Sequence, residues 1–379
     1  MQNIIHPKLE KSINDWLKER FQGLKLPFYS SIDLRNSGYK IAPVDANLFP
    51  AGFNNFSEES KVTAAKLVKS YFEKQQYRKV LIIPENYTRN KMYIENVFAI
   101  EKILQMAGFE TRIGLLSDET YNLIESYETI IKEGSLLKTK SGFVPDVVIL
   151  NRDMTSHIPD TLKDVKQEIT PNPLYGWHSR HKLKYFEIYE KLALEFCNEL
   201  AIDPWLIFAF TENCNEVDFN DNLSLERIAA KVDHVLSLMR KKYEEYGIET
   251  QPYVFIKASN GTYGMGIITA ENGDEILNIN KKKRNKMNKI KEGVKINSVI
   301  IQEGIPTIDV FKNSPAEPLI YYIGDTPACY LYRCNDRKDV YSSLNSTDCE
   351  FYDIGRTIEE KLWNIVSKLA VLALAVELS

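Results

Sequence analysis

YVFIKASNGTYGMGI, residues 253–267, joins a short apolar run to a glycine-rich segment. Period-two alternation predicts a strand that places Phe255 and Lys257 on one face and Ile256 on the other. Because both faces are mostly apolar, the Lys257 ammonium group needs an anionic partner. The three glycines that follow let backbone N–H groups approach a ligand closely. The stretch therefore indicates either a phosphate-binding lysine with a glycine-rich flap, or a β-hairpin with a polar turn and a lysine that reaches solvent.

Composition and charge are those of an ordinary soluble globular protein. The chain has 379 residues, enough for two or three domains, and its 48 Lys and Arg against 52 Asp and Glu give a net charge of -4. This balance argues against general nucleic-acid binding. The five cysteines are sparse and form no CxxC pair, which indicates neither a disulfide framework nor a zinc site and fits a reducing cytoplasm. We expect no signal peptide and no membrane span, since no apolar run is long enough to cross a bilayer.

Residues 57–153 alternate between helical and strand patterns. Ser57 is predicted to cap a helix that runs to about residue 75. A second helix is expected at residues 91–106, with strands at residues 78–85, 109–114 and 146–153. Such alternation predicts a sheet with parallel strands, and ligands of these sheets bind beyond the carboxyl ends of the strands. Polar residues that follow the strands, Arg152 among them, are candidate ligand-binding residues, although structural turns use the same residue types.

Residues 30–56 mix strand-like pieces with Asn, Gly and Pro turns. We expect a long irregular polar loop, which is more often functional than idle in a globular chain. The alternative is a solvated connector. The polar groups of this segment that could hold a ligand are Asp33, Arg35, Lys40, Asp45, Asn47, Asn54 and Asn55.

The segment PNPLYGWHSRHKLK, residues 171–184, precedes a predicted helix that runs to about residue 200. Its Arg180 is a candidate carboxylate clamp. His178 and His181 could share one helical face as metal ligands, but no third ligand lies at a familiar spacing, so a structural role is favoured.

Further helices and strands follow from the same periodicities. Helices are expected at residues 8–22, 223–246 and 358–378, with another ending in the basic run at residues 281–291; strands are expected at residues 265–270 and 297–304 and, joined by a Gly324-Asp325 turn, within residues 317–335. The basic run lacks interleaved aromatic residues, so it indicates a solvated helix face rather than a nucleic-acid site.

The second half of the chain has an ordered set of chemical groups. It supplies a strand lysine, a glycine-rich flap, a strand ending in Gln302 and Glu303, a hairpin with Arg333, and Asn345 in SSLNS. This order resembles the ATP-grasp superfamily. Four longer segments are similar to the ATP-grasp type of glutamate-cysteine ligase found in proteobacteria: SIDLRNSGYKIAPVDANLFPAGFNNF, YVFIKASNGTYGMGI, KRNKM and VIIQEGIPT.

The resemblance implies an α/β fold that is α+β in its C-terminal part. A Rossmann-like substrate domain, placed at residues 1–190, would precede an ATP-grasp domain at residues 191–379. ATP would lie between two subdomains of the latter. Small-molecule substrates, and neither nucleic acid nor a membrane, would be the partners, and the sequence is compatible with a homo-oligomer.

The resemblance also implies roles for individual residues. Lys257 would contact phosphate and Arg333 would stabilise the developing phosphoryl charge, which makes these two the catalytic candidates. The flap would consist of Gly261, Thr262, Tyr263 and Gly264, and the adenine and ribose pocket of Gln302, Glu303 and Ile305. Asn345 would help hold Mg²⁺, with Glu317 and Asp353 as candidate carboxylate ligands. The amino-acid substrates would be bound by Arg35, Asn47, Asn54, Arg152 and Arg180.

The implied reaction joins the γ-carboxylate of glutamate to cysteine at the expense of ATP. It would pass through an acyl phosphate and give γ-glutamylcysteine, ADP and phosphate, the first step of glutathione biosynthesis. An acyl phosphate hydrolyses readily, so a closing flap that excludes water has a purpose. The alternatives are another ATP-grasp carboxylate-amine ligase, such as a glutathione-synthetase-like enzyme or a peptide ligase, and a non-catalytic ATP-binding protein.

Overall fold

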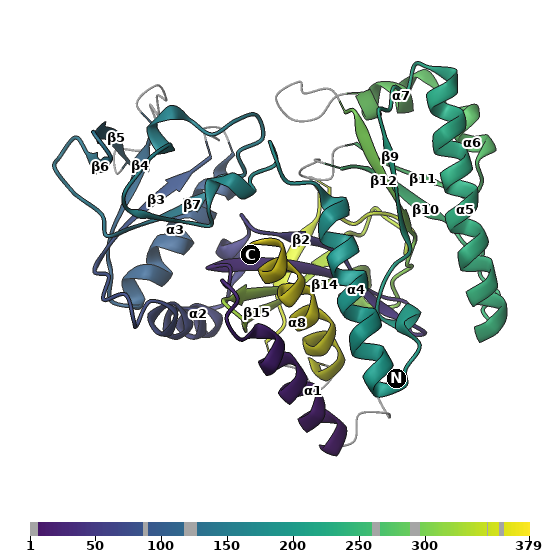
Figure 1. Cartoon of the computed structure of the whole chain (residues 1–379), viewed down its shortest axis with the longest axis horizontal. Helices are drawn as coiled ribbons and strands as arrows, with labels where there is room; N and C mark the ends of the chain where they lie inside the picture. Colours follow the sequence, from purple (N-terminus) through teal and green to yellow (C-terminus); the bar gives the residue numbers. More distant parts are fainter. Residues whose placement is uncertain are drawn as a thin grey trace.

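The computed structural model describes residues 7–85, 90–116, 127–259, 266–288, 296–346, 348–355 and 360–379. These residues form three β-sheets with helices packed against them, a mixed α/β architecture (Figure 1). The helices are α1 (Pro7–Phe21), α2 (Glu58–Tyr71), α3 (Lys91–Met106), α4 (Lys182–Leu200), α5 (Asn222–Tyr246), α6 (Asp274–Leu277), α7 (Lys281–Asn288) and α8 (Glu360–Glu377). Among the described residues, no helix combines the length and the apolar character that crossing a membrane requires.

The sheet on the left of Figure 1 is the predicted parallel sheet. Its strands, in spatial order, are β6 (Leu136–Thr139), β5 (Tyr127–Glu133), β4 (Glu110–Leu115), β3 (Lys79–Pro84), β7 (Val147–Asn151) and β8 (Glu168–Thr170). All neighbours pair in parallel except β5 and β6. The predicted cap is confirmed, because the Ser57 hydroxyl accepts a hydrogen bond from the Ser60 N–H at the start of α2. The short strands β5, β6 and β8 were not predicted.

The central sheet is antiparallel and joins the two ends of the chain. Its strands, in spatial order, are β16 (Glu350–Asp353), β15 (Thr326–Cys334), β14 (Ser314–Ile323), β1 (Tyr29–Asn36) and β2 (Ile41–Asn47), with β13 (Val310–Phe311) paired to β14. The predicted Gly324-Asp325 turn is confirmed between β14 and β15, where Gly324 has a φ of 59°. The expected domain boundary at residue 190 stays a prediction, and this sheet takes strands from both sides of it.

The expectation of an irregular loop over residues 30–56 is wrong for its first half, which forms strands β1 and β2. In β1, Ile32 and Leu34 point into the main core. Ser31, Asp33 and Arg35 alternate with these two residues and lie on the other face of the strand. The polar residues that suggested a loop are therefore one face of a strand.

Helices cover the central sheet unequally. Helices α1, α4 and α8 pack on one face, and α8 is buried along residues 366–375. Helix α2 packs against β14 and β15 on the other face and links them to the parallel sheet. Successive residues of β14 pack into opposite cores: Ile320 lies in the core that contains α8, and Leu319 in the core that contains α2.

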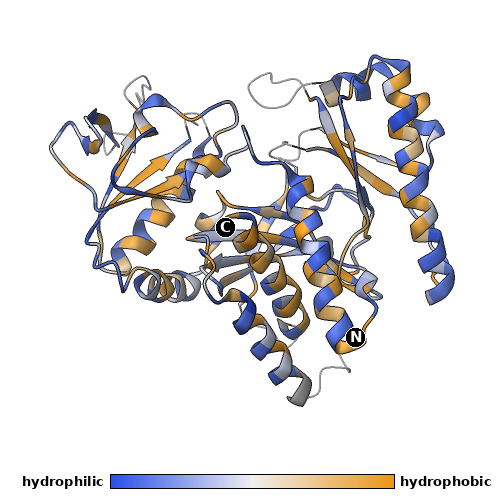
Figure 2. Cartoon of the chain, in the orientation of Figure 1, coloured by the Kyte–Doolittle hydropathy of each residue, from blue (hydrophilic) through white to orange (hydrophobic). Residues whose placement is uncertain are grey.

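The third sheet contains the stretch YVFIKA. Its strands, in spatial order, are β11 (Ile267–Ala270), β10 (Val254–Ala258), β12 (Ser298–Glu303) and β9 (Thr211–Asn215). Helix α5 covers it with residues spaced three and four apart, such as Ile228, Val232 and Val235. Figure 2 shows hydrophilic residues along the outer side of this helix and mostly hydrophobic strands behind it. The predicted flap, with Gly261, Thr262, Tyr263 and Gly264, lies outside the described residues.

Candidate active site

The three sheets converge on a cavity of about 600 Å³. The central sheet contributes a polar wall that consists of Ser31, Asp33, Arg35, Glu317 and Arg333. Strand β10 contributes Phe255, Lys257 and Ala258. The parallel sheet contributes residues that follow the carboxyl ends of its strands β3 and β7, namely Asn90, Tyr93, Asn96 and Asp153. The cavity therefore borders the edge of the parallel sheet at which a ligand was predicted.

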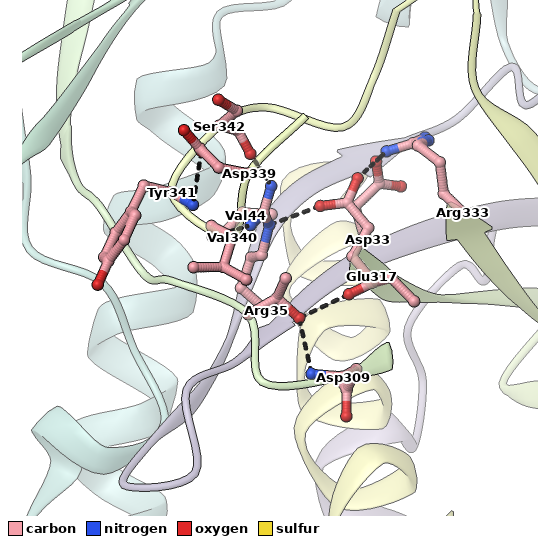
Figure 3. Close-up of polar contacts among 12 residues, drawn as sticks. Asp33, Arg35, Val44, Asp309, Glu317, Arg333, Asp339, Val340, Tyr341 and Ser342 are labelled. Atoms are coloured by element: carbon pink, nitrogen blue, oxygen red, sulfur yellow. Dashed lines mark hydrogen bonds and ion pairs between the residues drawn. The ribbon is translucent and has the colours of Figure 1, made fainter. Parts of the chain in front are cut away.

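Four charged side chains on the polar wall form a continuous chain of ion pairs (Figure 3). Glu317 Oε2 lies 2.5 Å from Arg35 Nε, and its Oε1 lies 2.6 Å from Arg333 Nη1. The same Arg333 nitrogen lies 2.8 Å from Asp33 Oδ2. Arg35 also donates to the Val340 and Ser342 carbonyls. These ion pairs hold all four side chains in place, and the two positive charges balance the two negative charges.

The pKa values of the two carboxyl groups in these ion pairs, Glu317 and Asp33, are shifted in opposite directions. Burial favours the neutral form of Glu317, but Arg35 and Arg333 outweigh it and hold the Glu317 pKa below its ordinary value. Burial raises the pKa of Asp33; Arg333 opposes that rise, while Asp45 and Glu317 add to it. Asp33 is thus the less well compensated of the two carboxylates.

Lys257 lies in the cavity wall and has neutral partners. Its ammonium donates to Gln302 Oε1 at 2.8 Å and to the Val44 carbonyl at 3.2 Å. Burial, reinforced by the positive charge of Lys182, lowers its pKa to about 8. Among the described residues, no carboxylate is hydrogen-bonded to Lys257, so the anionic partner predicted for it is not found in direct contact. Asp45 and Glu317 favour its charged form from a distance but do not outweigh burial and Lys182.

Next to Lys257 lie a second lysine and a carboxylate. Lys182 Nζ lies 2.7 Å from Asp45 Oδ1. Burial favours the neutral form of Asp45, but Lys182 and Lys257 help hold its pKa below the ordinary value. Lys182 was not predicted as a site residue, although it lies in the same basic segment as Arg180.

Arg180 has the chemistry predicted for it but binds a carboxylate of the chain itself. Its Nε donates to both oxygens of Glu377, at 3.0 and 3.1 Å, and its Nη2 to Oε2 at 3.0 Å. Its Nη1 donates to the Ala46 carbonyl. Glu377 directly follows the apolar run of residues 369–376 at the end of α8, a sequence signal that could have indicated a buried partner.

Two of the three residues predicted for the adenine and ribose pocket have structural contacts of their own. None of Gln302, Glu303 and Ile305 is among the residues that line the cavity. Glu303 is fully buried and accepts from Lys40 Nζ at 2.8 Å. Ile305 packs against Ala42 in a small buried cluster. Gln302 orients Lys257, so its side chain serves the cavity indirectly.

The remaining predicted residues divide into two groups. Arg35, Asn47, Asn54, Glu317, Arg333 and Asn345 line the cavity, as do Lys257 and Arg180. Arg152 and Asp353 are not among the lining residues. Asp353 instead accepts from the Ser57 N–H, next to the start of α2.

The predicted magnesium ligands lie in different places. Both oxygens of Glu317 are taken by arginines and Asp353 lies outside the cavity lining, whereas Asn345 lines the cavity. Across the described ranges, no three His, Cys, Asp or Glu residues are grouped so that they could hold a metal ion. Because Mg²⁺ is usually held by one or two protein ligands together with substrate phosphates, its protein ligands stay a prediction.

An amide at the end of β7 holds the parallel sheet against the cavity. Asn151 Nδ2 donates to the Pro50 carbonyl at 2.9 Å and to Tyr29 Oη at 3.0 Å. Its Oδ1 accepts from Asn96 Nδ2, and Asn96 Oδ1 in turn accepts from the Gly52 N–H. Sequence placed Asn151 at a strand end but did not indicate these partners, which come from three separate segments.

Comparison with known proteins agrees with this geometry. A protein-family model described as glutamate-cysteine ligase matches residues 4–378. The chain belongs to the glutamate-cysteine ligase family. Membership makes the protein a ligase, and it confirms the family indicated by the four sequence segments.

Solved structures extend the comparison of this ligase. A crystal structure from Methylobacillus flagellatus KT, of a protein named as a candidate γ-glutamylcysteine synthetase, is 35% identical to the chain. The match has a TM-score of 0.87 and covers 97% of this chain and 93% of that one. D-alanyl-alanine synthetase A from Vibrio cholerae is distant, with 10% identity and a TM-score of 0.39 over 79% of this chain and 80% of that one, and adds nothing to the argument. A search of curated protein sequences finds no significant match.

Proposed function

We propose that this ligase joins the γ-carboxylate of glutamate to the amine of cysteine through an acyl phosphate, with ATP as the phosphoryl donor. The observation that carries the proposal is the presence in one cavity of Lys257, whose described hydrogen-bond partners are neutral, and of the Asp33–Arg333–Glu317 ion pairs. Family membership supports the same reaction class. The products would be γ-glutamylcysteine, ADP and phosphate.

The reaction brings like charges together, and cationic side chains would offset that repulsion. A glutamate γ-carboxylate oxygen attacks the γ-phosphorus of ATP, and the bond to ADP breaks. Lys257 would hold the phosphate, and Arg333 would stabilise the negative charge that develops on the transferring group. The cysteine amine then attacks the acyl carbon; the C–N bond forms, the bond to phosphate breaks, and phosphate leaves with the amine proton.

The domain arrangement and the metal belong to the same proposal. Residues 1–190 would form a Rossmann-like substrate domain and residues 191–379 an ATP-grasp domain that binds ATP near the sheet containing β10. The parallel sheet with α2 and α3 and the separate sheet with Lys257 support two such units, whereas the central sheet and α4 (Lys182–Leu200) run across the boundary at residue 190. We propose that Mg²⁺ enters as the complex with ATP, which supplies phosphate oxygens, and that Asn345 in the cavity wall would help hold it.

A phosphate-release assay tests the reaction. The protein is incubated with ATP, with and without Mg²⁺, and with glutamate alone, cysteine alone or both. We expect phosphate release only with the pair, and mass spectrometry should identify a γ-linked dipeptide. Equal release with either amino acid alone would contradict the assignment. Release with a different amine acceptor would indicate another carboxylate-amine ligase, and tight ATP binding without ADP formation under any pair would indicate a non-catalytic protein.

A further inference from the structure

The Asp33–Arg333 ion pair leaves two buried polar atoms without a partner. Asp33 Oδ2 accepts from Arg333 Nη1 at 2.8 Å, whereas Asp33 Oδ1 and Arg333 Nε have no hydrogen-bond partner among the described residues. Both residues line the cavity. Buried polar groups in native proteins are nearly always hydrogen-bonded. Because the two atoms belong to residues of the cavity wall, a ligand that fits closely against this wall is a candidate for the missing partners.

The two atoms need opposite chemistry. The carboxylate oxygen of Asp33 needs a hydrogen-bond donor or a cation, and the Arg333 N–H needs an acceptor; a positive donor and an anionic acceptor make the strongest bonds with these charged groups. Both oxygens of the neighbouring Glu317 are already bound to Arg35 and Arg333, so this carboxylate is poorly placed to share a divalent metal with Asp33. An ammonium group needs fewer ligands and donates directly to one carboxylate oxygen. An amino acid brings such an ammonium group together with an anionic group.

We propose that Asp33 Oδ1 binds the protonated α-amine of an amino-acid substrate. The glutamate α-amine takes no part in the reaction and can stay protonated, whereas the cysteine α-amine would have to give up one proton before it attacks the acyl carbon. The inference rests on the proposed function, in which glutamate and cysteine are the two amino acids that enter the cavity. Arg333 Nε is then left for the anionic group beside that amine, a carboxylate or the transferring phosphoryl group. Asp33 is a substrate-binding residue in this account, and it also keeps Arg333 in position.

The electrostatics of the site agree with this geometry. Burial raises the pKa of Asp33; Arg333 lowers it, but Asp45 and Glu317 add to the rise. A positive group at Oδ1 would favour the charged carboxylate, as an opposite charge does at short range. The substrate amine would therefore supply the compensation that Asp33 lacks relative to Glu317.

The proposal is tested by removing the amine from the ligand and the Asp33 carboxylate from the protein, singly and together, and comparing the binding affinities. Isothermal titration calorimetry compares glutamate with glutaric acid and cysteine with 3-mercaptopropionic acid, pairs in which the second member lacks only the amine. In the wild-type protein, loss of the amine from one of the two amino acids should weaken binding about 10- to 100-fold, and the affected pair identifies the substrate that Asp33 holds. In Asp33→Asn that loss should fall to less than about threefold. Asp160→Asn, which removes an exposed carboxylate paired with Lys163, should keep the wild-type difference.

Three results would overturn the proposal. One is equal binding of both amino acids and their amine-free analogues by the wild-type protein, which needs no variant. The second is an unchanged amine dependence in Asp33→Asn, or in Asp33→Ser if the asparagine variant does not fold. The third is a loss of Mg²⁺ affinity in these variants while the amine dependence stays unchanged, which would make Asp33 a metal ligand. Absence of phosphate release by the wild-type protein would overturn only the proposed function, because the binding measurements need no turnover.

Discussion

Lys40 Nζ lies 2.8 Å from Glu303 Oε1, and both side chains are completely buried. Lys40 directly precedes β2 of the central sheet, and Glu303 ends β12 of the sheet that contains Lys257. The indole N–H of Trp205 donates to the same carboxylate, and the Lys40 ammonium lies 4.2 Å from the Trp205 ring centroid. The pair therefore joins two of the three sheets that surround the cavity.

Removal of Lys40 should destabilise the protein strongly. Lys40→Met leaves the Glu303 carboxylate buried without its counter-charge, and we expect the free energy of unfolding to fall by about 3–5 kcal/mol. The double variant Lys40→Met/Glu303→Leu removes both charges and should recover much of the loss. Urea unfolding measures both. Arg20→Met, at the exposed Arg20–Glu195 pair, is the control and should cost less than about 1 kcal/mol. Similar losses for Lys40→Met and Arg20→Met would contradict the prediction.

Lys257→Met should leave the fold intact and remove most ATP-dependent turnover. Among the described residues, the substitution removes hydrogen bonds only to a Gln302 oxygen and to the Val44 carbonyl, whereas the proposed phosphate contact is lost entirely. We expect kcat/KM for ATP to fall at least about 100-fold, as for loss of a charge-assisted contact in the transition state. Lys312→Met, at a lysine outside the cavity lining, is the matched control. Wild-type turnover in Lys257→Met would remove Lys257 from the proposed mechanism.

The pH dependence of the reaction should report the same lysine. Burial, followed by the charge of Lys182, lowers the Lys257 pKa to about 8, so the ammonium is charged at pH 7 and loses its proton as the pH rises through about 8. We expect kcat/KM for ATP to decline over that range, since this parameter follows the free enzyme. Lys257→Arg keeps its charge, and any activity it retains should decline only at higher pH. An identical alkaline decline in both proteins would assign it to another group.

The Arg180–Glu377 contact should stabilise the C-terminal helix. Both side chains are 3% exposed, so Glu377→Ala leaves a buried guanidinium without a counter-charge and should lower the free energy of unfolding by about 3–5 kcal/mol. Glu377→Gln keeps an acceptor and should cost less. Differential scanning calorimetry of the two variants measures which substitution costs more stability. A larger loss for Glu377→Gln would show that the charge of Glu377 does not stabilise the helix.

Local patterns predicted most of the helices and strands. Helix α3 spans Lys91–Met106 as expected from its apolar spacing, and the Gly324 turn was read directly from two adjacent residues. Strand β1 was missed because Ser31, Asp33 and Arg35 read as loop residues. They alternate with Ile32 and Leu34, so a period-two pattern with a polar site face would have indicated the strand.

The site was predicted in its composition but not in its pairings. Arg35, Lys257 and Arg333 were named from residue type and order, and all three line the cavity. Their partners depend on which distant strands lie side by side, which no local pattern encodes. Glu303 was therefore assigned to a ligand pocket, although its carboxylate binds Lys40, and Arg180 was assigned to a substrate, although it binds Glu377.

The pairing of β1 with β14 has a consequence for how the site is assembled during synthesis. Asp33 and Arg333 are 300 residues apart, so the polar wall can form only after the ribosome has released nearly all of the chain. The parallel sheet uses residues closer in sequence and is expected to fold earlier, because contacts of low sequence separation close smaller loops. Pulse-labelling hydrogen exchange during refolding should show protection of β3 and β7 before β1. Ligands of this cavity then act on the last part of the molecule to become ordered.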